Sequence, residues 1–369
     1  MPISASYYTT TICNAKCGFC DIWEGKPSSK PRLVPLDKAE RIISGLKKLG
    51  VKYIDFTGGE PLLCRNLPEL LRIAKSKGIR TGVCSNGFLY PGRADELKGL
   101  VDSQAFSLDS ADRDRHNASR QIVAYDRIIE SIEIAKRNKT FVNINFSVGN
   151  ENLHEVEPMC KLAKDLQVVV HVMPMFSYFG NAALQKELTA HLKSLFLKPY
   201  MSVNLASVKL QKAGGNDIAK PKCKAIRANI AVSPDGKFYL PCYHAAVDKP
   251  EIEDDIVAQW KSPYMQEQIA KAGRYDFCQG CSIWCYLTPS FLYTLDSYFL
   301  LQAFSYGVSS GKAVLGKTRE MIGLGRKITY EEYRREGRPT TELDELLEEP
   351  VVRLGSVDEF KRDRDLVSK

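Results

Sequence analysis

Three cysteines near the start of the chain have a spacing that suits a metal centre. Cys13, Cys17 and Cys20 are separated by three and then by two residues, and the next cysteine, Cys64, is far along the chain. Iron–sulfur clusters are held by cysteine thiolates, usually four to a cluster. Three thiolates would leave one iron of a four-iron cluster open, which is typical of a metal that takes part in chemistry. A structural zinc site, a disulfide loop and three unrelated thiols are the alternatives.

A second motif follows the next predicted strand. Residues 55–61 read Asp-Phe-Thr-Gly-Gly-Glu-Pro, so an apolar strand runs into two glycines and a carboxylate. Glycine lets the backbone approach a ligand closely, and the carboxylate of Glu60 can accept hydrogen bonds from an ammonium group. Because a short motif alone is weak evidence, the same segment could also be an ordinary turn.

Taken together and in this order, the two motifs resemble those of the radical S-adenosylmethionine (radical SAM) enzymes. In that superfamily a Cys-x3-Cys-x2-Cys loop follows the first strand, and a Gly-Gly-Glu-Pro segment ends the second. The resemblance covers roughly the first 175 residues. It implies that the three cysteines hold a 4Fe–4S cluster whose open iron binds S-adenosylmethionine. It also implies that Gly58, Gly59 and Glu60 hold the methionine end of that cofactor.

The first half of the chain alternates short apolar strands with helical patterns. We predict strands at residues 4–10, 51–57, 79–84, 103–109, 141–148 and 168–173, and helices near 37–48, 67–77, 92–99, 122–138 and 154–166. Asp37 is predicted as a helix N-cap, and Gly50 as the stop after that helix. The six strand–helix units predict an α/β fold in which a parallel sheet curls into a partial (β/α)6 barrel. Ligands then bind at the carboxyl ends of the strands.

Polar residues near these strand ends are candidate cofactor ligands. Ser85 follows the third strand, and Ser107 and Asp109 close the fourth on one face, because side chains alternate along a strand. In the resembled superfamily such a Ser-x-Asp segment often contacts the ribose or amino-acid part of S-adenosylmethionine. The resemblance also implies that Arg120 lies in a ligand-binding loop and that Phe19 packs on the adenine side. Asp109 could instead cap the next helix.

Two further strands carry polar side chains that should point into the barrel. Asn143 and Asn145 alternate along the fifth predicted strand, and His171 and Met173 along the sixth. An unpaired buried amide is costly, so a polar ligand or water would satisfy the asparagines. His171 could line the substrate space or be an ordinary core histidine.

Five more cysteines gather in the second half of the chain, around a hairpin-like stretch at residues 230–242. This stretch contains Pro-Asp-Gly, a turn signal, and it follows a predicted joint at residues 214–216. The five thiols suggest a second metal centre, with zinc as the alternative to iron–sulfur. They resemble the truncated SPASM, or Twitch, modules, which implies one auxiliary 4Fe–4S cluster and one spare cysteine. The candidate ligands are Cys223, Cys242, Cys278, Cys281 and Cys285.

These patterns divide the chain into a barrel at residues 1–212, an auxiliary module at 213–288 and a helical, partly disordered extension at 289–369. The composition of the 369 residues, with 44% hydrophobic and 26% charged residues, is ordinary for a globular protein. The chain has neither a long uncharged apolar run nor a basic-then-apolar start. We therefore predict a soluble, unexported, cytoplasmic protein, which also suits clustered thiols. The net charge of +8 is spread out and indicates no nucleic-acid partner.

The resemblance predicts an enzyme that cleaves S-adenosylmethionine to a 5′-deoxyadenosyl radical, which abstracts hydrogen from an unactivated C–H bond. An electron donor such as flavodoxin or ferredoxin is implied. The aromatic-rich segment 289–306 favours oxidation or modification of a small hydrophobic molecule, either a tetrapyrrole such as a bacteriochlorophyllide or an isoprenoid lipid. One alternative is a maturase that modifies an amino-acid side chain of a peptide or protein. Another is a non-catalytic iron–sulfur binding protein, against which the presence of both motifs argues.

Overall fold

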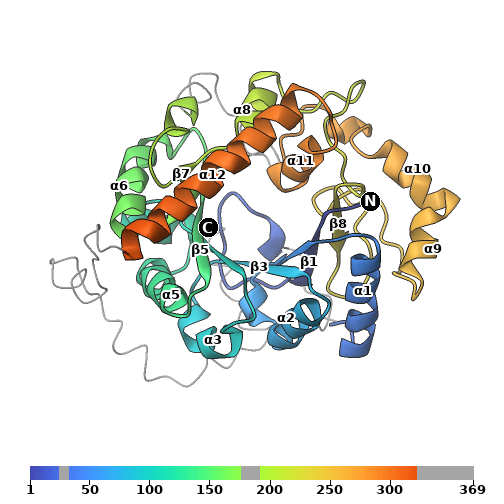
Figure 1. Ribbon diagram of the computed structural model, residues 1–369, viewed down its shortest axis with the longest axis horizontal. Helices are drawn as coiled ribbons and strands as arrows, with labels where there is room; N and C mark the ends of the chain where they lie inside the picture. Colours follow the sequence, from blue (N-terminus) through green and yellow to red (C-terminus); the bar gives the residue numbers. More distant parts are fainter. Residues whose placement is uncertain (25–32, 176–191, 322–369) are drawn as a thin grey trace, which may run out of the picture. The chain divides into compact units, whose positions relative to one another are not determined.

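The computed structural model describes residues 1–24, 33–175 and 192–321. Their main feature is a sheet of eight strands in the order β7-β6-β5-β4-β3-β2-β1-β8, in which all neighbours run parallel. Helices lie around this sheet (Figure 1). The α/β barrel-like class predicted from the sequence is confirmed. The charged region beyond residue 325 lies outside the described residues.

The six predicted strands are all present, each within two residues of its expected ends. They are β1 (Ser4–Thr10), β2 (Tyr53–Gly58), β3 (Arg80–Ser85), β4 (Ser103–Ser107), β5 (Phe141–Val148) and β6 (Val169–Pro174). Two short strands, β7 (Met201–Ser202) and β8 (Asn229–Val232), extend the sheet at its two edges. Because β8 pairs with β1, the first strand of the cysteine-rich segment belongs to the same sheet as the first motif.

The helices of the first half also follow the prediction, with one addition and one correction. They are α1 (Leu36–Lys48), α2 (Leu67–Ser76), α3 (Tyr90–Leu97), α4 (Arg113–Arg120), α5 (Tyr125–Arg137) and α6 (Val156–Leu166). The sequence reading missed α4 because it is very polar, without an apolar stripe. Asp37 is not an N-cap: Pro35 has that position, and Asp37 lies in the first turn, where its charge suits the helix dipole. Gly50 has φ +98°, as a helix stop requires.

The later helices are α8 (Leu205–Lys212), α9 (Ile256–Lys261), α10 (Pro263–Lys271), α11 (Trp284–Phe291) and α12 (Ser297–Met321). Short 3-10 turns lie at Ile22–Glu24, Pro61–Leu63, Leu153–Glu155 and Asp276–Cys278. The aromatic-rich segment forms α11 and the start of α12, which runs beside α8 (Figure 1). Asn204 donates a 2.6 Å hydrogen bond to Gln302 there. No helix among the described residues is both long and apolar enough to cross a membrane.

The two faces of the sheet have different chemistry. On β2, Ile54 and Phe56 are buried toward the surrounding helices, whereas Tyr53, Asp55 and Thr57 on the other face stay partly exposed. This strict alternation follows from the two-residue period of a strand. Apolar side chains therefore stabilise the fold from the outer face, and the inner face is left free to carry polar groups.

Candidate active site at the carboxyl ends of the strands

The two sequence motifs are in direct backbone contact. The N–H groups of Gly59 and Glu60 each donate a 2.8 Å hydrogen bond, to the carbonyls of Thr10 and Ile12. A Cβ atom on Gly58 would lie 2.2 Å from the Thr10 carbonyl oxygen, and one on Gly59 would lie 2.1 Å from that of Ile12. The sequence reading assigned the glycines to close approach of a ligand. The structure shows that they admit the chain leading into the Cys13 loop.

The side chain of Glu60 is pinned by three hydrogen bonds within the protein. It accepts from the Leu62 N–H at 3.0 Å, the Ser85 hydroxyl at 2.8 Å and the Asn86 N–H at 2.8 Å, and only 1% of the residue is exposed. Burial raises the pKa of Glu60, and these donors oppose the rise. Glu60 and Ser85 therefore join the ends of β2 and β3, and a ligand would meet the backbone of Glu60 rather than its carboxylate.

A buried ion pair supports the cysteine loop from the other side. Arg120 Nε lies 2.6 Å from Asp109 Oδ2, and both side chains are at least nine-tenths buried. Arg120 Nη1 lies 3.9 Å from Cys17 Sγ, and its guanidinium lies 5.3 Å from the centre of the Phe19 ring. Burial is the largest single influence on Arg120 and opposes its charge, but the Asp109 carboxylate and the Cys17 and Cys84 thiols together outweigh burial and raise the Arg120 pKa. Asp109 does not cap a helix, since the side chain of Asp112 caps α4.

The three thiols of the first motif influence one another, with Cys17 buried and Cys13 and Cys20 half-buried. Burial raises the pKa of Cys13 to about 12 and that of Cys20 to about 11, and the Cys17 thiol acts in the same direction on both. The Trp23 indole donates to the Cys17 carbonyl at 3.3 Å, which covers this side of the loop. Thiols bind metals as thiolates, so three neighbouring thiols beside a guanidinium form a donor set that fits a three-cysteine iron–sulfur cluster.

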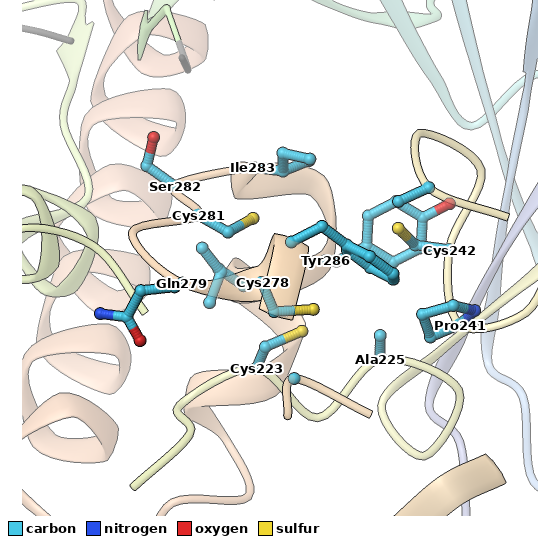
Figure 2. Close-up of a pocket in the computed structure, with 14 residues that line it drawn as sticks. Cys223, Ala225, Pro241, Cys242, Cys278, Gln279, Cys281, Ser282, Ile283 and Tyr286 are labelled. Carbon is cyan, nitrogen blue, oxygen red and sulfur yellow. The ribbon is translucent and has the colours of Figure 1, made fainter. Parts of the chain in front are cut away.

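Four of the five later cysteines line one pocket. The pocket is shared by Cys223, Cys242, Cys278 and Cys281, which lie around a common space in Figure 2. Burial raises the pKa of Cys242 to about 12 and that of Cys281 to about 11. Across the described ranges, no group of three or more Cys, His, Asp or Glu side chains is gathered as a single metal ion would require. Cluster ligands attach to different irons, so four thiols around a wider space fit a 4Fe–4S cluster.

The predicted joint at residues 214–216 ends in a buried part of this second site, although Gly214 is exposed and Gly215 is half-buried. Asn216 is fully buried; it accepts from the Cys223 N–H at 3.0 Å and donates to the Cys278 carbonyl at 3.2 Å. A Cβ on Gly215, whose φ is +90°, would lie 2.1 Å from the Gly280 carbonyl oxygen. The glycine and the asparagine therefore connect the two halves of the cysteine set, a role that the turn composition alone did not indicate.

Cys285 is not among the residues that line the four-cysteine pocket. Its Sγ lies 3.9 Å from His244 Nε2. The neighbouring Tyr286 does line the pocket, and its hydroxyl accepts from the Tyr243 N–H at 2.9 Å. Tyr243 in turn stacks on Tyr8 of β1, with ring centres 4.1 Å apart. Aromatic side chains thus connect the second site to the strand that precedes the first motif.

The inner face of the sheet below the first site carries a chain of neutral polar groups. Ser103 donates to Asn143, Asn143 to Asn145, each at 3.3 Å, and Asn145 lies 3.3 Å from Cys84 Sγ. The two asparagines point inward as predicted, but they find partners within the sheet instead of requiring a ligand. Burial lowers the pKa of His171, on the same face, to about 4, so its imidazole is neutral at physiological pH.

Three functional candidates are not among the predicted ligands, although Asn86 and His116 lie in the polar segments that follow the third and fourth predicted strands. Asn86 donates to the Asn14 side chain at 2.7 Å and so links the end of β3 to the cysteine loop. His116 is fully buried, and its Nδ1 accepts from the Asp109 N–H at 3.3 Å. Asp55 lies on the inner face, two residues before Thr57. The sequence signal for Asp55 is the alternation along β2, which places it on the same face as Thr57. Ser107, a predicted ligand, ends β4 on the inner face, in register with Asn145.

The chain is similar to proteins of a known superfamily. Residues 7–163 match the family model of the radical SAM superfamily. A protein of Metallosphaera sedula described as "Probable GTP 3′,8-cyclase" is 26% identical over 255 residues, 63% of this chain and 78% of that protein. One of Thermoplasma volcanium with the same description is 33% identical over 175 residues, 46% and 53% of the two chains.

Two solved structures share the fold. Streptococcus suis SuiB superposes with a TM-score of 0.59 at 15% identity, covering 81% of this chain and 77% of that one. The protein anSMEcpe with bound AdoMet superposes with a TM-score of 0.56 at 17% identity, covering 88% and 99%. At such identities the likeness concerns the fold.

Proposed function

Residues 7–163 form a radical SAM superfamily domain, and from this premise we propose that the chain removes a hydrogen atom from a small molecule held against the inner face of its sheet. When bound, S-adenosylmethionine and the 4Fe–4S cluster supply the 5′-deoxyadenosyl radical for this chemistry, which belongs to the cofactors. Cys13, Cys17 and Cys20 would hold the cluster. The protein contributes orientation and the exclusion of water.

One observation carries this proposal: the cysteine loop, the Gly-Gly-Glu segment and the Asp109–Arg120 pair meet at one edge of the sheet. The backbone bonds of Gly59 and Glu60 hold the loop against β2, and Arg120 approaches Cys17 from α4. The pair keeps a cation beside thiols that must become thiolates. We infer that Phe19, Ser107 and the backbone of residues 58–60 border the S-adenosylmethionine site.

For the second site we propose an auxiliary 4Fe–4S cluster on Cys223, Cys242, Cys278 and Cys281, with Cys285 as the spare thiol. The shared pocket and the buried Asn216 between its two halves support this assignment. Four protein ligands would close the cluster to other ligands. Such a site suits electron transfer better than direct binding of substrate.

We consider three classes of substrate: a hydrophobic molecule, a nucleotide and a peptide. The predicted hydrophobic substrate has support at α12, where Leu300 is 66% and Phe304 57% exposed. The inner face of the sheet is polar, however, so the reacting part of such a molecule should carry hydrogen-bonding groups. The curated relatives favour a nucleotide, and a modified peptide is the remaining candidate. The cytoplasmic location and a flavodoxin or ferredoxin as electron donor remain predictions.

The proposed function is tested by anaerobic assay of the reconstituted protein with S-adenosylmethionine and dithionite, with 5′-deoxyadenosine as the product measured. We expect release by the wild type and none by Cys17→Ala, because the cluster loses one of only three ligands. Cys160→Ala is the matched control, since that thiol lies on α6 and outside both cysteine sets. Full activity of Cys17→Ala, or no 5′-deoxyadenosine from the wild type with any reductant, would contradict the proposal.

A further inference from the structure

A carboxylate faces the interior of the barrel without a cationic partner in the described part of the chain. Asp55 is partly exposed on the inner face of β2, while its neighbours Ile54 and Phe56 are buried on the outer face. Burial raises the pKa of Asp55 to about 6, and the Tyr53 hydroxyl, which donates a hydrogen bond, opposes the rise. No described lysine or arginine contributes to this balance. Asp55 is thus ionised at neutral pH with one neutral donor.

The neighbouring strand makes room for this carboxylate. A Cβ on Gly82 of β3 would lie 1.7 Å from the Tyr53 hydroxyl oxygen and 3.0 Å from Asp55 Oδ1. Only glycine leaves space there for both side chains, so β2 and β3 together hold the carboxylate in place. Keeping a charge inside a fold without a counter-charge costs free energy. Groups held in that way are concentrated at functional sites.

The other groups around Asp55 do not neutralise it. The titratable side chains that interact with its charge are Tyr53 on β2, Cys84 on β3 and Cys285 on α11. Burial raises the pKa of all three, and the Asp55 charge acts in the same direction. Tyrosine and cysteine side chains are either neutral or anionic, so none of the three carries a positive charge at any pH. The amide of Asn145, also on the inner face, donates to Cys84. The described protein groups thus offer Asp55 no charged donor, and a bound molecule could supply one.

We propose that Asp55 anchors the substrate by accepting hydrogen bonds from an ammonium or hydroxyl group of that molecule, an inference that rests on the proposed function. Such a group supplies the missing donor, and hydrogen bonds to a charged acceptor are the strong ones. A phosphate group placed at this position would instead bring negative charge toward the carboxylate, and like charges at a binding site oppose association. The preferred substrate therefore carries an amine or hydroxyl at the end that enters the barrel.

A matched set of short linear molecules tests this preference. Putrescine, 1,4-butanediol and succinate end in ammonium, hydroxyl and carboxylate groups. Their binding to reconstituted protein with S-adenosylmethionine, without reductant, is measured by calorimetry for the wild type, Asp55→Asn, Asp55→Leu and the control Asp95→Asn. The control carboxylate is exposed on α3. Circular dichroism checks that each variant is folded.

We expect putrescine to bind Asp55→Asn about tenfold or more weakly than the wild type, because a charge-assisted bond is lost. The affinity for butanediol should fall about twofold in Asp55→Asn, because the amide oxygen still accepts a hydrogen bond. It should fall about tenfold in Asp55→Leu, which has no acceptor. Asp95→Asn should change neither affinity. Tighter binding of putrescine identifies an ammonium site, and tighter binding of butanediol a hydroxyl site. Succinate binding as tightly as the other two, or equal affinities in wild type and both Asp55 variants, would overturn the inference.

The pH dependence provides a test that a purely structural aspartate would not satisfy. Putrescine affinity should fall as the pH drops through about 6, because protonation removes the Asp55 charge. The Tyr53 hydroxyl lowers the Asp55 pKa. Removing it in Tyr53→Phe should therefore raise that pKa and move the midpoint to higher pH. A midpoint that stays unchanged in Tyr53→Phe counts against the inference.

The two proposals fail separately. Wild-type protein that cleaves S-adenosylmethionine but binds succinate as well as putrescine contradicts only the Asp55 anchor. Wild-type protein that never releases 5′-deoxyadenosine contradicts the proposed function, whatever the binding measurements show.

Discussion

The two cysteine sites differ in what holds their thiols. At the first site, Cys17 lies beside the guanidinium of Arg120, which is itself paired with Asp109. At the second, the neutral amide of Asn216 joins the Cys223 and Cys278 segments. The first site offers three thiols and the second four. This contrast is the one expected between a reactive metal site with an open position and a closed one.

The difference also concerns how each site is connected to the barrel. The first loop is placed by backbone contacts that need glycine, as at Gly59 against Ile12. The second set is attached through β8, which pairs with β1, and through the stack of Tyr8 on Tyr243. Strand β1 therefore leads into the first site and supports the second, which gives the two proposed clusters a common rigid element.

The largest expected effect is the loss of a whole cluster when a ligand of the second site is replaced, compared with no loss when the spare thiol is replaced. Cys281→Ser should lose the iron and sulfide of one cluster, because Cys281 lines the shared pocket, while Cys285→Ser should retain both clusters. The measurement is iron and sulfide content after anaerobic reconstitution, with electron paramagnetic resonance of the reduced protein. If Cys285→Ser loses as much iron as Cys281→Ser, the assignment of the four ligands is wrong.

The next effect tests the ion pair that distinguishes the first site. Asp109→Asn leaves the Arg120 charge buried without its partner, which should lower the free energy of unfolding by about 3–5 kcal/mol. Urea unfolding measures this loss. The control is Glu267→Gln, which removes an exposed pair with Lys271 on α10 and should change stability little. Equal, small effects of the two substitutions would mean that the Asp109–Arg120 pair does not support the first site.

A smaller effect is expected from the glycine contact. Gly59→Ala places a methyl group 2.1 Å from the Ile12 carbonyl oxygen, so the cysteine loop must shift at a cost of about 1–3 kcal/mol. Iron retention should weaken at the first site and stay normal at the second. Gly92→Ala is the control, because nothing lies within 4 Å of a Cβ there. The loop contact is unimportant if both alanine variants retain iron and stability equally.

Local signals in the chain predicted much of the barrel. Short apolar runs located all six central strands. Only some of these strands, such as β2, show the two-residue alternation of a single buried face, whereas β1 is buried along almost its whole length. Gly50 ended the first helix as its positive φ requires. The very polar α4 was missed, although it carries Arg120 and ends beside the cysteine loop. Its stability depends on the cap from Asp112 and on tertiary contacts rather than on an apolar stripe.

The sequence by itself determined the residue types of both cysteine sets and the motif order that links this chain to a superfamily. Short spacings carry that information because thiols a few residues apart can reach one metal centre. Only the tertiary structure decided which groups meet. It pairs Arg120 with Asp109 and Glu60 with Ser85. It also places four of the five later cysteines around one pocket that Cys285 does not line. These partners lie on different strands, helices and loops, and even Asp109 and Arg120, 11 residues apart, meet only through the turn into α4. Their contacts depend on the register and curvature of the sheet, which local composition does not encode.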